Sequence, residues 1–247
     1  MMSDVLPEEI LINAISTMLE GLNHVAIGAS SPVPGGAALL AQNRTGGKLR
    51  VTFNGAPGQS AFTDGGKELF DCTGQGRIDA FFLGGAQIDG QANINLVSIG
   101  DPDQPKVRFQ GSFGSAFMYY LVPRVILFRL EHTPRTLVEK VDYISAPGVS
   151  DPEVYRPGGP YALITDRCLF SFDRAKGRFT LESVHPGHTV EEIREQTGFD
   201  YDVSDTVGET PTPDAETLSI IRGPVAQKLA EVYPAFAERV FGIEKAA

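Results

Sequence analysis

Apolar residues in the first half of the chain follow two patterns, helical spacing and short continuous runs. Between Glu8 and Leu22 they recur every three or four positions, which predicts a helix that ends near Gly21. A second helix is predicted to open at 37–41, after a glycine-rich turn that ends at Gly36. Apolar runs outside these helices predict strands. The predicted strands cover 24–28, 49–53, 79–83, 93–99 and 124–130.

After residue 148 the pattern changes to paired short strands. Apolar runs at 161–165 and 168–172 flank a short polar turn and predict a hairpin, and a third strand is predicted over 178–182. Thr189 and Glu192 form a capping-box pattern at the start of a helix. That helix is predicted to end near Gly198, and a last helical region follows Pro213-Asp214.

Strands that alternate with helices are typical of an α/β fold with an open, mostly parallel sheet. We therefore predict one domain over 1–247, with a parallel α/β core at 1–148 and an antiparallel hairpin with C-terminal helices at 149–247. Ligands of such sheets bind beyond the carboxyl ends of the strands. The turns of interest follow Gly28, Phe53 and Leu83.

Composition and charge exclude several classes of protein. The 31 acidic residues outnumber the 21 basic ones, giving a net charge of −10, so a nucleic-acid-binding footprint is not expected. No apolar run is long enough to span a membrane, and the first residues do not resemble a signal peptide, which predicts a cytoplasmic protein. Cys72 and Cys168 lie far apart, so neither a disulfide nor a zinc site is predicted.

Two glycine-rich turns are candidates for binding a ligand through the main chain. Gly84-Gly85-Ala86-Gln87 follows an apolar run and offers adjacent backbone amides without side chains over them, so a polarised carbonyl or a phosphate can approach closely. The second turn, 110–115, contains Gly111, Ser112 and Gly114. Paired glycines after a strand also occur as simple turns.

Familiar catalytic and metal-binding motifs are missing from the sequence. It contains no Walker loop, GxGxxG fingerprint, GxSxG elbow, HExxH pair or EF-hand loop, and no metal site is predicted. His132 follows a predicted strand and is a candidate base, and His185 and His188 flank a Pro-Gly turn. The alternative for all three is an ordinary surface or loop histidine.

Several blocks in fixed order resemble the β subunit of family I CoA-transferases, particularly the glutaconate CoA-transferase branch. The similarity covers nearly the whole chain. The most specific block is 82–90, and the later blocks contain Asn93, Asn95, 98–101, 105–106, 108–109, 111–112, 140–143, Ser145, 147–148, 165–166, 197–200 and 202–203.

The resemblance implies a three-layer α/β fold of the CoA-transferase type and an acyl-CoA site shared with an α subunit. The assembly would be a heterodimer or heterotetramer that uses coenzyme A thioester as substrate and needs no other cofactor. Both glycine turns would lie near the thioester. The residues expected to bind CoA or the acyl group are Gly84, Gly85, Ala86, Gln87, Gly111, Ser112 and Gly114.

The sequence departs from the family at the position of the catalytic nucleophile. In those enzymes a glutamate in a Ser-Glu-Asn-Gly or Glu-Ser-Gly context attacks the thioester and forms a covalent glutamyl-CoA intermediate. Here Phe53 occupies that position, with Asn54 and Gly55 adjacent. A phenyl ring can neither ionise nor form an anhydride, so the catalytic residue of this chain is unknown. On this basis Phe53→Glu is expected to leave the fold intact and to test whether transfer activity returns.

Other groups after Phe53 are possible substitutes. The carboxylates of Asp64, Glu68 and Asp71 either reach the site or are ordinary solvated side chains. The thiol of Cys72 is a nucleophile only if a neighbouring cation, Lys67 or Arg77, stabilises the thiolate.

Three hypotheses for function remain. The first is a β subunit that binds acyl-CoA but carries out hydrolysis or decarboxylation, as some superfamily members without the glutamate do. In the ring-opening hydrolases of that group, a glutamate of the α subunit is thought to be the base. The second is a true transferase whose nucleophile comes from another position. The third is a non-catalytic partner of an α subunit.

Overall fold

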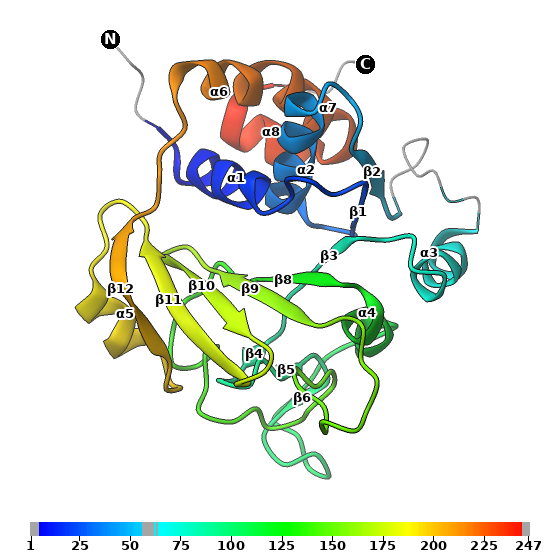
Figure 1. The fold of residues 1–247 in the computed structure, drawn as a ribbon, viewed down its shortest axis with the longest axis vertical. Coiled ribbons are helices and arrows are strands. Elements are labelled where there is room, and N and C mark those ends of the chain that lie inside the picture. Colours follow the sequence, from blue (N-terminus) through cyan, green and yellow to red (C-terminus); the bar gives the residue numbers. More distant parts are fainter. Residues whose placement is uncertain (1–4, 56–61, 63, 244–247) are drawn as a thin grey trace. The chain divides into compact units, whose positions relative to one another are not determined.

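A computed structural model describes residues 5–55, 62 and 64–243. Its contacts group the chain into two compact units, which are Met1–Phe81 with Pro211–Ala247, and Phe82–Thr210 (Figure 1). The sequence pattern instead indicated a change of architecture after residue 148. The prediction of a single domain over 1–247 stays a prediction, and each unit is described on its own.

The first unit contains three parallel strands near the N-terminus. They are β1 (His24–Ile27), β2 (Arg50–Phe53) and β3 (Ala80–Leu83), whose last two residues begin the second unit. Strand β1 pairs in parallel with β2, Ile27 opposite Phe53, and with β3, Val25 opposite Ala80. All of β1 is buried, as expected for a parallel strand covered on both faces. The three strands predicted from apolar runs are confirmed.

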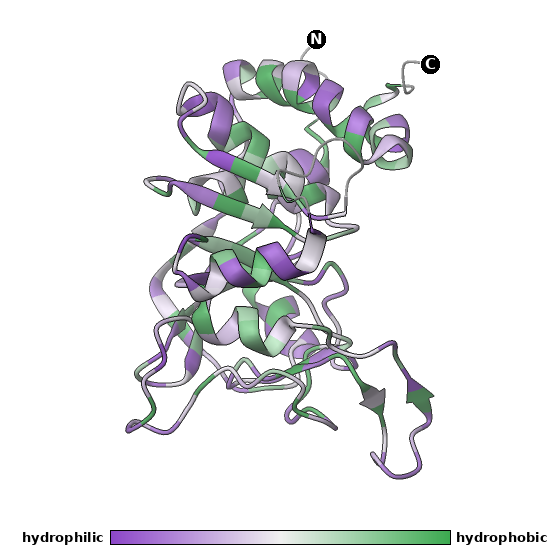
Figure 2. Ribbon diagram, turned by 90° about the vertical axis from the view of Figure 1, so that its right-hand side faces the viewer, coloured by the Kyte–Doolittle hydropathy of each residue, from purple (hydrophilic) through white to green (hydrophobic). Residues whose placement is uncertain are grey.

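Helices from both ends of the chain pack together in this unit (Figure 1). Helix α1 packs on α2, and α7 packs on α2 from the other end of the sequence. Each of these helices contains both hydrophobic and hydrophilic residues, which interrupt one another along the helix (Figure 2). Their bounds are α1 (Pro7–Thr17), α2 (Pro32–Arg44), α3 (Gly65–Gly74), α6 (Ala215–Ile220), a π-helical turn (Ile221–Val225), α7 (Ala226–Val232) and α8 (Pro234–Phe241).

Helix α2 starts earlier than the sequence pattern predicted. It begins at Pro32, and Gly35 and Gly36 lie inside it instead of in the preceding turn. A Cβ on Gly36 would lie 2.9 Å from Ile12 Cδ1 and 3.2 Å from Leu229 Cδ1. The two glycines therefore permit close helix packing, and this tertiary requirement outweighs the low helix propensity of glycine.

Five strands of the second unit pair side by side in the order β12-β11-β10-β9-β8. The predicted hairpin is confirmed, because β9 and β10 pair antiparallel, as do β10 and β11. Strands β8 and β9 pair in parallel, and so do β11 and β12. The α/β class with mostly parallel pairing is confirmed. The bounds are β8 (Arg124–Phe128), β9 (Pro160–Ile164), β10 (Cys168–Asp173), β11 (Arg178–Val184) and β12 (Asp202–Glu209).

Strand β12 and the cap of helix α5 differ from the sequence prediction. Strand β12 was not predicted, because most of its residues are polar or small and it has no apolar run. Helix α5 (Val190–Gln196) is capped as predicted by the Thr189 side chain, which accepts the Glu192 N–H. The Glu192 carboxylate, however, bonds to Arg167 and His188, so only half of the capping box forms.

The continuous strand predicted over 93–99 is wrong. The segment forms β5 (Ile94–Asn95), which pairs with β4 (Gln87–Ile88), and then β6 (Ser98–Ile99), which pairs with β7 (Val107–Arg108). The Asn95 Oδ1 accepts the backbone N–H groups of Val97 at 3.0 Å and Ser98 at 3.3 Å. This side-chain turn separates the two strands. Helix α4 (Ser115–Leu121) follows.

Candidate functional site

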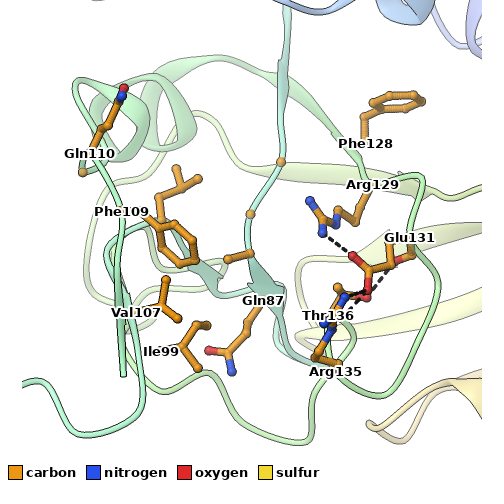
Figure 3. A pocket seen from close by; sticks show the side chains of 15 residues that line it. Gln87, Ile99, Val107, Phe109, Gln110, Phe128, Arg129, Glu131, Arg135 and Thr136 are labelled. Atoms are coloured by element: carbon orange, nitrogen blue, oxygen red, sulfur yellow. Dashed lines mark hydrogen bonds and ion pairs between the residues drawn. The ribbon is translucent and has the colours of Figure 1, made fainter. Parts of the chain in front are cut away.

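A pocket of about 840 Å³ lies within the second unit and contains the first glycine turn. This volume falls within the range of small-molecule sites. Figure 3 shows Ile99, Val107 and Phe109 on one side of the pocket and Arg129, Glu131 and Arg135 on the other. The lining residues are Gly84, Gly85, Ala86, Gln87, Leu96, Ile99, Val107, Phe109, Gln110, Gly111, Phe128, Arg129, Glu131, Arg135 and Thr136.

The glycine turn connects the end of β3 to β4, and packing explains both glycines. A Cβ on Gly84 would lie 2.8 Å from the Phe128 carbonyl oxygen. One on Gly85 would lie 2.6 Å from Ile94 Cγ2 and 2.8 Å from the Gln87 carbonyl oxygen. The turn is also held by the Ala86 N–H, which donates to the Asn95 carbonyl at 2.9 Å. The main chain is thus held in place where it borders the pocket.

The Gln87 side chain is buried and already hydrogen-bonded within the protein. Its Oε1 accepts from Asn95 Nδ2 at 2.7 Å and from the Asp142 N–H at 2.9 Å, and its Nε2 donates to Asp142 Oδ2 at 3.1 Å. Asp142 Oδ2 also accepts the Gly100 N–H at 2.8 Å. Gln87 therefore links Asn95 and Asp142 in the pocket wall, and its side-chain oxygen and nitrogen are both used in these hydrogen bonds.

A carboxylate between two guanidinium groups forms the charged side of the pocket. Arg129 Nη2 donates to Glu131 Oε2 at 2.6 Å, and Arg135 donates to Glu131 Oε1 through Nε at 3.2 Å and through Nη2. The hydrogen bonds from Arg135, followed by those from Arg129, lower the pKa of Glu131. Glu131 is therefore ionised at neutral pH and bound on both oxygens.

Sequence reasoning missed this cluster. Its signal was a pair of arginines, Arg129 and Arg135, on either side of Glu131 at the carboxyl end of the strand predicted over 124–130. Thr136 supports the segment by donating from Oγ1 to the Glu131 carbonyl at 2.6 Å.

The opposite side of the pocket is apolar. It is formed by side chains from the short β6–β7 hairpin and the residues next to it: Leu96, Ile99, Val107 and Phe109. Val107 and Phe109 are exposed on the protein surface. In Figure 3 Ile99, Val107 and Phe109 face the side of the pocket that carries Glu131 and the arginines, with Gln87 between.

The second glycine turn contributes only in part. Gly111 lines the pocket with φ of +100°, a conformation that glycine adopts without strain. Ser112 and Gly114 do not line the pocket among the described residues. The Ser112 carbonyl accepts the Ser115 N–H, and the Gly114 carbonyl accepts the Met118 N–H, so both residues support the start of α4.

Phe53 is a core residue of the first unit. It is 4% exposed, and its ring meets the Tyr233 ring edge-on with centroids 6.0 Å apart. A Cβ on Gly35 would lie 2.9 Å from Phe53 Cε1, so the ring packs directly against α2. The Asn54 N–H donates to the Ile27 carbonyl at 2.8 Å, and Gly55 turns the chain with φ of +74°.

The candidate base His132 and the two histidines beside the Pro-Gly turn, His185 and His188, have structural partners. His132 is buried, with Nδ1 2.8 Å from Thr165 Oγ1 and Nε2 2.9 Å from Thr197 Oγ1. His185 is buried between Thr210 Oγ1 and the Thr165 carbonyl. Burial lowers the pKa of both His132 and His185 to about 4. His188 contacts Glu192. These contacts fit the ordinary-histidine interpretation.

The substitute nucleophiles considered after Phe53 lie on or next to α3 in the first unit. Asp64 forms an exposed ion pair with Lys67 at 3.4 Å, and Asp71 is exposed on the helix. Glu68 accepts the Asp64 N–H at 3.3 Å, and Cys72 is half-buried. None of these side chains belongs to the lining of the pocket in the second unit, as far as the structure describes that lining.

The described residues contain neither a metal-binding cluster nor a membrane-spanning helix. No group of three or more His, Cys, Asp or Glu side chains is arranged to hold a metal ion. Similarly, the described helices include none with the length and apolar character to cross a membrane.

Comparison with known proteins identifies the family. The family model for coenzyme A transferase matches residues 4–196, which is most of the chain. The chain therefore belongs to the coenzyme A transferase family. The predicted resemblance to a CoA-transferase β subunit is confirmed by its sequence relatives, of which a glutaconate CoA-transferase subunit of the B type from Acidaminococcus fermentans is 38% identical over 148 residues.

That alignment covers 57% of this chain and 54% of the relative. A cholesterol ring-cleaving hydrolase IpdB subunit from Rhodococcus jostii is 29% identical over 160 residues, which cover 63% of this chain and 62% of the relative. The chain thus aligns with little more than half the length of these relatives.

Solved structures share the fold. A chain of glutaconate coenzyme A-transferase from Acidaminococcus fermentans superposes with a TM-score of 0.78 at 24% identity, covering 93% of this chain and 99% of that chain. A chain of the decarboxylase AibA/AibB gives a TM-score of 0.76 at 24% identity, with 97% and 100% coverage. These likenesses establish the fold of the CoA-transferase type.

Proposed function

We propose that this chain is the β subunit of a heteromeric enzyme that binds an acyl-CoA thioester and hydrolyses or decarboxylates the acyl group. The observation that carries the proposal is the position of the Gly84–Gln87 turn in the wall of an 840 Å³ pocket. Backbone at this turn is held by packing on Phe128 and Ile94, and pre-organised main chain of this kind suits a polarised thioester carbonyl.

An α subunit of the same family is the proposed partner. Two of the relatives are named as subunits, and AibA/AibB is named as a pair. The β chain would supply the glycine turn and the apolar wall, and the α chain would supply catalytic groups that this pocket does not contain. The assembly is proposed as a heterodimer or heterotetramer with no cofactor other than the coenzyme A of the substrate.

The residue at the nucleophile position favours hydrolysis or decarboxylation over CoA transfer. Transfer through a covalent intermediate needs an ionisable carboxylate, and by resemblance Phe53 stands at that position. Its ring packs on Gly35 and Tyr233 within the core. Neither hydrolysis nor decarboxylation needs an enzyme-bound anhydride, and the names of two relatives describe a hydrolase and a decarboxylase.

CoA transfer with a nucleophile from another position is the second candidate, because Glu131 places a carboxylate in the pocket. Two arginines bind both of its oxygens and lower its pKa, which reduces its nucleophilicity. A non-catalytic role is the third candidate, and the formed pocket does not favour it.

The test uses the complex of this chain with its α subunit. The complex is incubated with acyl-CoA, and the loss of CO₂ from the acyl group or the addition of water to it is measured by mass spectrometry of the thioester, with and without an acceptor carboxylate. We expect one of these two changes, at a rate that does not depend on the acceptor. Ping-pong exchange of CoA between two acids, with a hydroxylamine-sensitive adduct on a carboxylate, would establish transfer and overturn the proposal.

Binding at the glycine turn is tested with Ala86→Leu. Ala86 already has a Cβ and lines the pocket, so the larger side chain fills the pocket without introducing backbone strain. We expect weaker acyl-CoA binding by calorimetry. Ala116→Leu on the exposed surface of α4 is the matched control, because it makes the same change outside this pocket. Equal affinity of both variants would remove the turn from the site.

A further inference from the structure

A smaller pocket, of about 320 Å³, lies between the segment that precedes β9 and the turn that joins β10 to β11. Ser150, Asp151 and Arg156 line it from the segment before β9, and Arg174 lines it from the turn. None of the described residues lines both this pocket and the 840 Å³ pocket of the glycine turn. The two pockets are therefore separate.

The smaller pocket lies at the opposite end of the strands from the 840 Å³ pocket. Phe128, at the carboxyl end of β8, lines the larger pocket, whereas Gly158, just before β9, lines the smaller one. Strands β8 and β9 are parallel, with Val125 opposite Pro160. The length of these short strands separates the two ends by about 15 Å. A ligand in the smaller pocket is thus distant from the proposed site of the thioester.

The side chains of Arg156 and Arg174 lie close together beside Gly159. A Cβ on Gly159 would lie 3.3 Å from Arg174 Cδ and 3.5 Å from Arg156 Nε. Neither arginine forms an ion pair with a carboxylate among the described residues, whereas Arg178 on β11 pairs with Asp202 at 2.7 Å. Burial lowers the pKa of Arg156, and the charge of Arg174 acts in the same direction. Two like charges this close repel each other, so an anion that binds both is stabilised.

The two arginines and Ser150 keep hydrogen-bond donors for a ligand. A guanidinium carries five N–H donors. Arg156 uses one for Ser150 Oγ at 3.2 Å and one for each of two backbone carbonyls, so two remain. Because Ser150 Oγ accepts that bond, its own proton can be donated to a ligand. Arg174 donates once, to the Pro157 carbonyl at 3.4 Å, and keeps four N–H groups.

The charge and the number of donors favour a phosphate group. Asp151, Arg156 and Arg174 are the described lining residues that carry a charge, so the lining has one net positive charge in a chain of net charge −10. The donors come from three side chains, and a phosphate group offers three acceptor oxygens where a carboxylate offers two. Arginine forks bind phosphate through two parallel hydrogen bonds.

We propose that Arg156, Arg174 and Ser150 form a binding site for a phosphate group, separate from the acyl-CoA pocket. The ligand is inorganic phosphate or the phosphate ester of a small metabolite. Arg156 is held in place, with its guanidinium carbon 5.2 Å from the centre of the Tyr119 ring, and exposed Arg174 completes the site from the other side. The inference does not rest on the proposed acyl-CoA function.

Calorimetry on the complex of this chain with its α subunit tests the site. Inorganic phosphate is titrated at constant ionic strength, set with chloride, and the titration is repeated with saturating coenzyme A, which carries phosphates of its own. We expect equal phosphate affinity in both titrations, because the pockets are separate. Competition with coenzyme A would overturn the inference. Glycerol 3-phosphate is titrated in parallel, and the tighter of the two ligands identifies whether the site takes free or esterified phosphate.

Substitutions assign the binding to these residues. Arg174→Gln should weaken phosphate binding by about tenfold or more, as for the loss of charged hydrogen bonds, and Arg174→Lys should restore only part because it keeps the charge and loses the fork. Ser150→Ala should weaken it less, since it removes one neutral donor. Arg108→Gln is the matched control, because Arg108 is also exposed and also donates to one backbone carbonyl at 3.4 Å, outside this pocket.

Two further results would overturn the inference. One is a wild-type complex that does not bind phosphate at constant ionic strength. The other is equal weakening by Arg174→Gln and Arg108→Gln, which would show a general effect of charge. Arg156→Gln should also abolish binding, but Arg156 holds two backbone carbonyls as well. If that variant does not fold, the variants of exposed Arg174 and Ser150 still decide the question.

Discussion

The ring of Phe53 meets the ring of Tyr233 edge-on, with the ring centroids 6.0 Å apart, beneath Gly35 of α2. Tyr233 also donates from its hydroxyl to the Gly28 carbonyl at 3.3 Å. The residue at the family's nucleophile position is therefore part of a packed cluster that joins the β1–α2 turn to the C-terminal helices of the first unit.

This packing changes the expectation for Phe53→Glu. From the sequence alone the substitution was expected to leave the fold intact. Phe53 is 4% exposed, so the variant loses buried aromatic contacts and places a carboxylate among apolar groups. We expect a loss of about 3–5 kcal/mol in the free energy of unfolding, measured by urea denaturation.

Phe53→Leu is the matched control, since it keeps an apolar side chain and should lose less. Phe53→Glu with wild-type stability would show that the ring is not packed as described. If the glutamate variant folds and gains CoA transfer, the position retains the geometry of the family's nucleophile.

Acid should destabilise the protein through its buried histidines. Burial lowers the pKa of His132 and His185 to about 4, against about 6.5 in an unfolded chain. Both are neutral when folded, so their contribution is fully present above about pH 6.5 and is lost as the pH falls toward 4. Each adds a slope of up to about 1.4 kcal/mol per pH unit in that window.

Urea denaturation at pH 5, 6 and 7 measures this slope. His132→Gln should lower the slope of the free energy of unfolding against pH by up to about 1.4 kcal/mol per pH unit, which corresponds to one proton. His188→Gln is the control, because it changes a histidine with a partly exposed side chain. A free energy of unfolding that stays constant between pH 7 and 5 would contradict neutral burial of these rings.

Alanine at two pocket glycines should have different costs. A Cβ on Gly85 would lie 2.6 Å from Ile94 Cγ2 and 2.8 Å from a carbonyl oxygen that cannot move freely, so Gly85→Ala forces the turn to shift. Gly111 has φ of +100° and open space around it, so Gly111→Ala costs only backbone strain of about 1–2 kcal/mol. Thermal unfolding of both variants measures the difference.

We expect Gly85→Ala to lower the melting temperature more than Gly111→Ala does. Adding Ile94→Ala should lessen the extra cost of alanine at position 85, because the nearest atom is removed, although the carbonyl contact stays. If the two single variants are equally stable, the turn is less tightly packed than the distances indicate.

The two cysteines should differ in reactivity. Cys168 is fully buried, and burial raises the pKa of its thiol, so it should resist alkylation in the native protein. Cys72 is half-buried on α3 and should react. Peptide mass mapping after iodoacetamide treatment should show label on Cys72 alone, and label on both after unfolding. Modification of native Cys168 at the rate of Cys72 would contradict its burial.

Local patterns in the sequence determined the class of fold and much of its first part. Apolar runs at 24–28, 49–53 and 79–83 correspond to β1, β2 and β3, because a strand covered on both faces must be apolar throughout. The hairpin at 161–172 and the Thr189 cap were predictable for the same reason, since turn and cap signals lie within a few residues of each other.

The sequence also drew attention to the glycine turn, and the order of its motif blocks indicated the family. Of the predicted ligand-binding residues, Gly84, Gly85, Ala86, Gln87 and Gly111 share one pocket. Ser112 and Gly114 belong instead to the start of α4, a distinction that spacing along the chain does not reveal.

Only the tertiary structure decided the rest, because it depends on contacts between distant residues. Gly35 and Gly36 are helical since Phe53, Ile12 and Leu229 pack against them. Strand β12 forms by pairing with β11 without an apolar pattern of its own. The cluster of Arg129, Glu131 and Arg135 becomes a candidate site because the fold places it in one pocket with a glycine turn from another part of the chain.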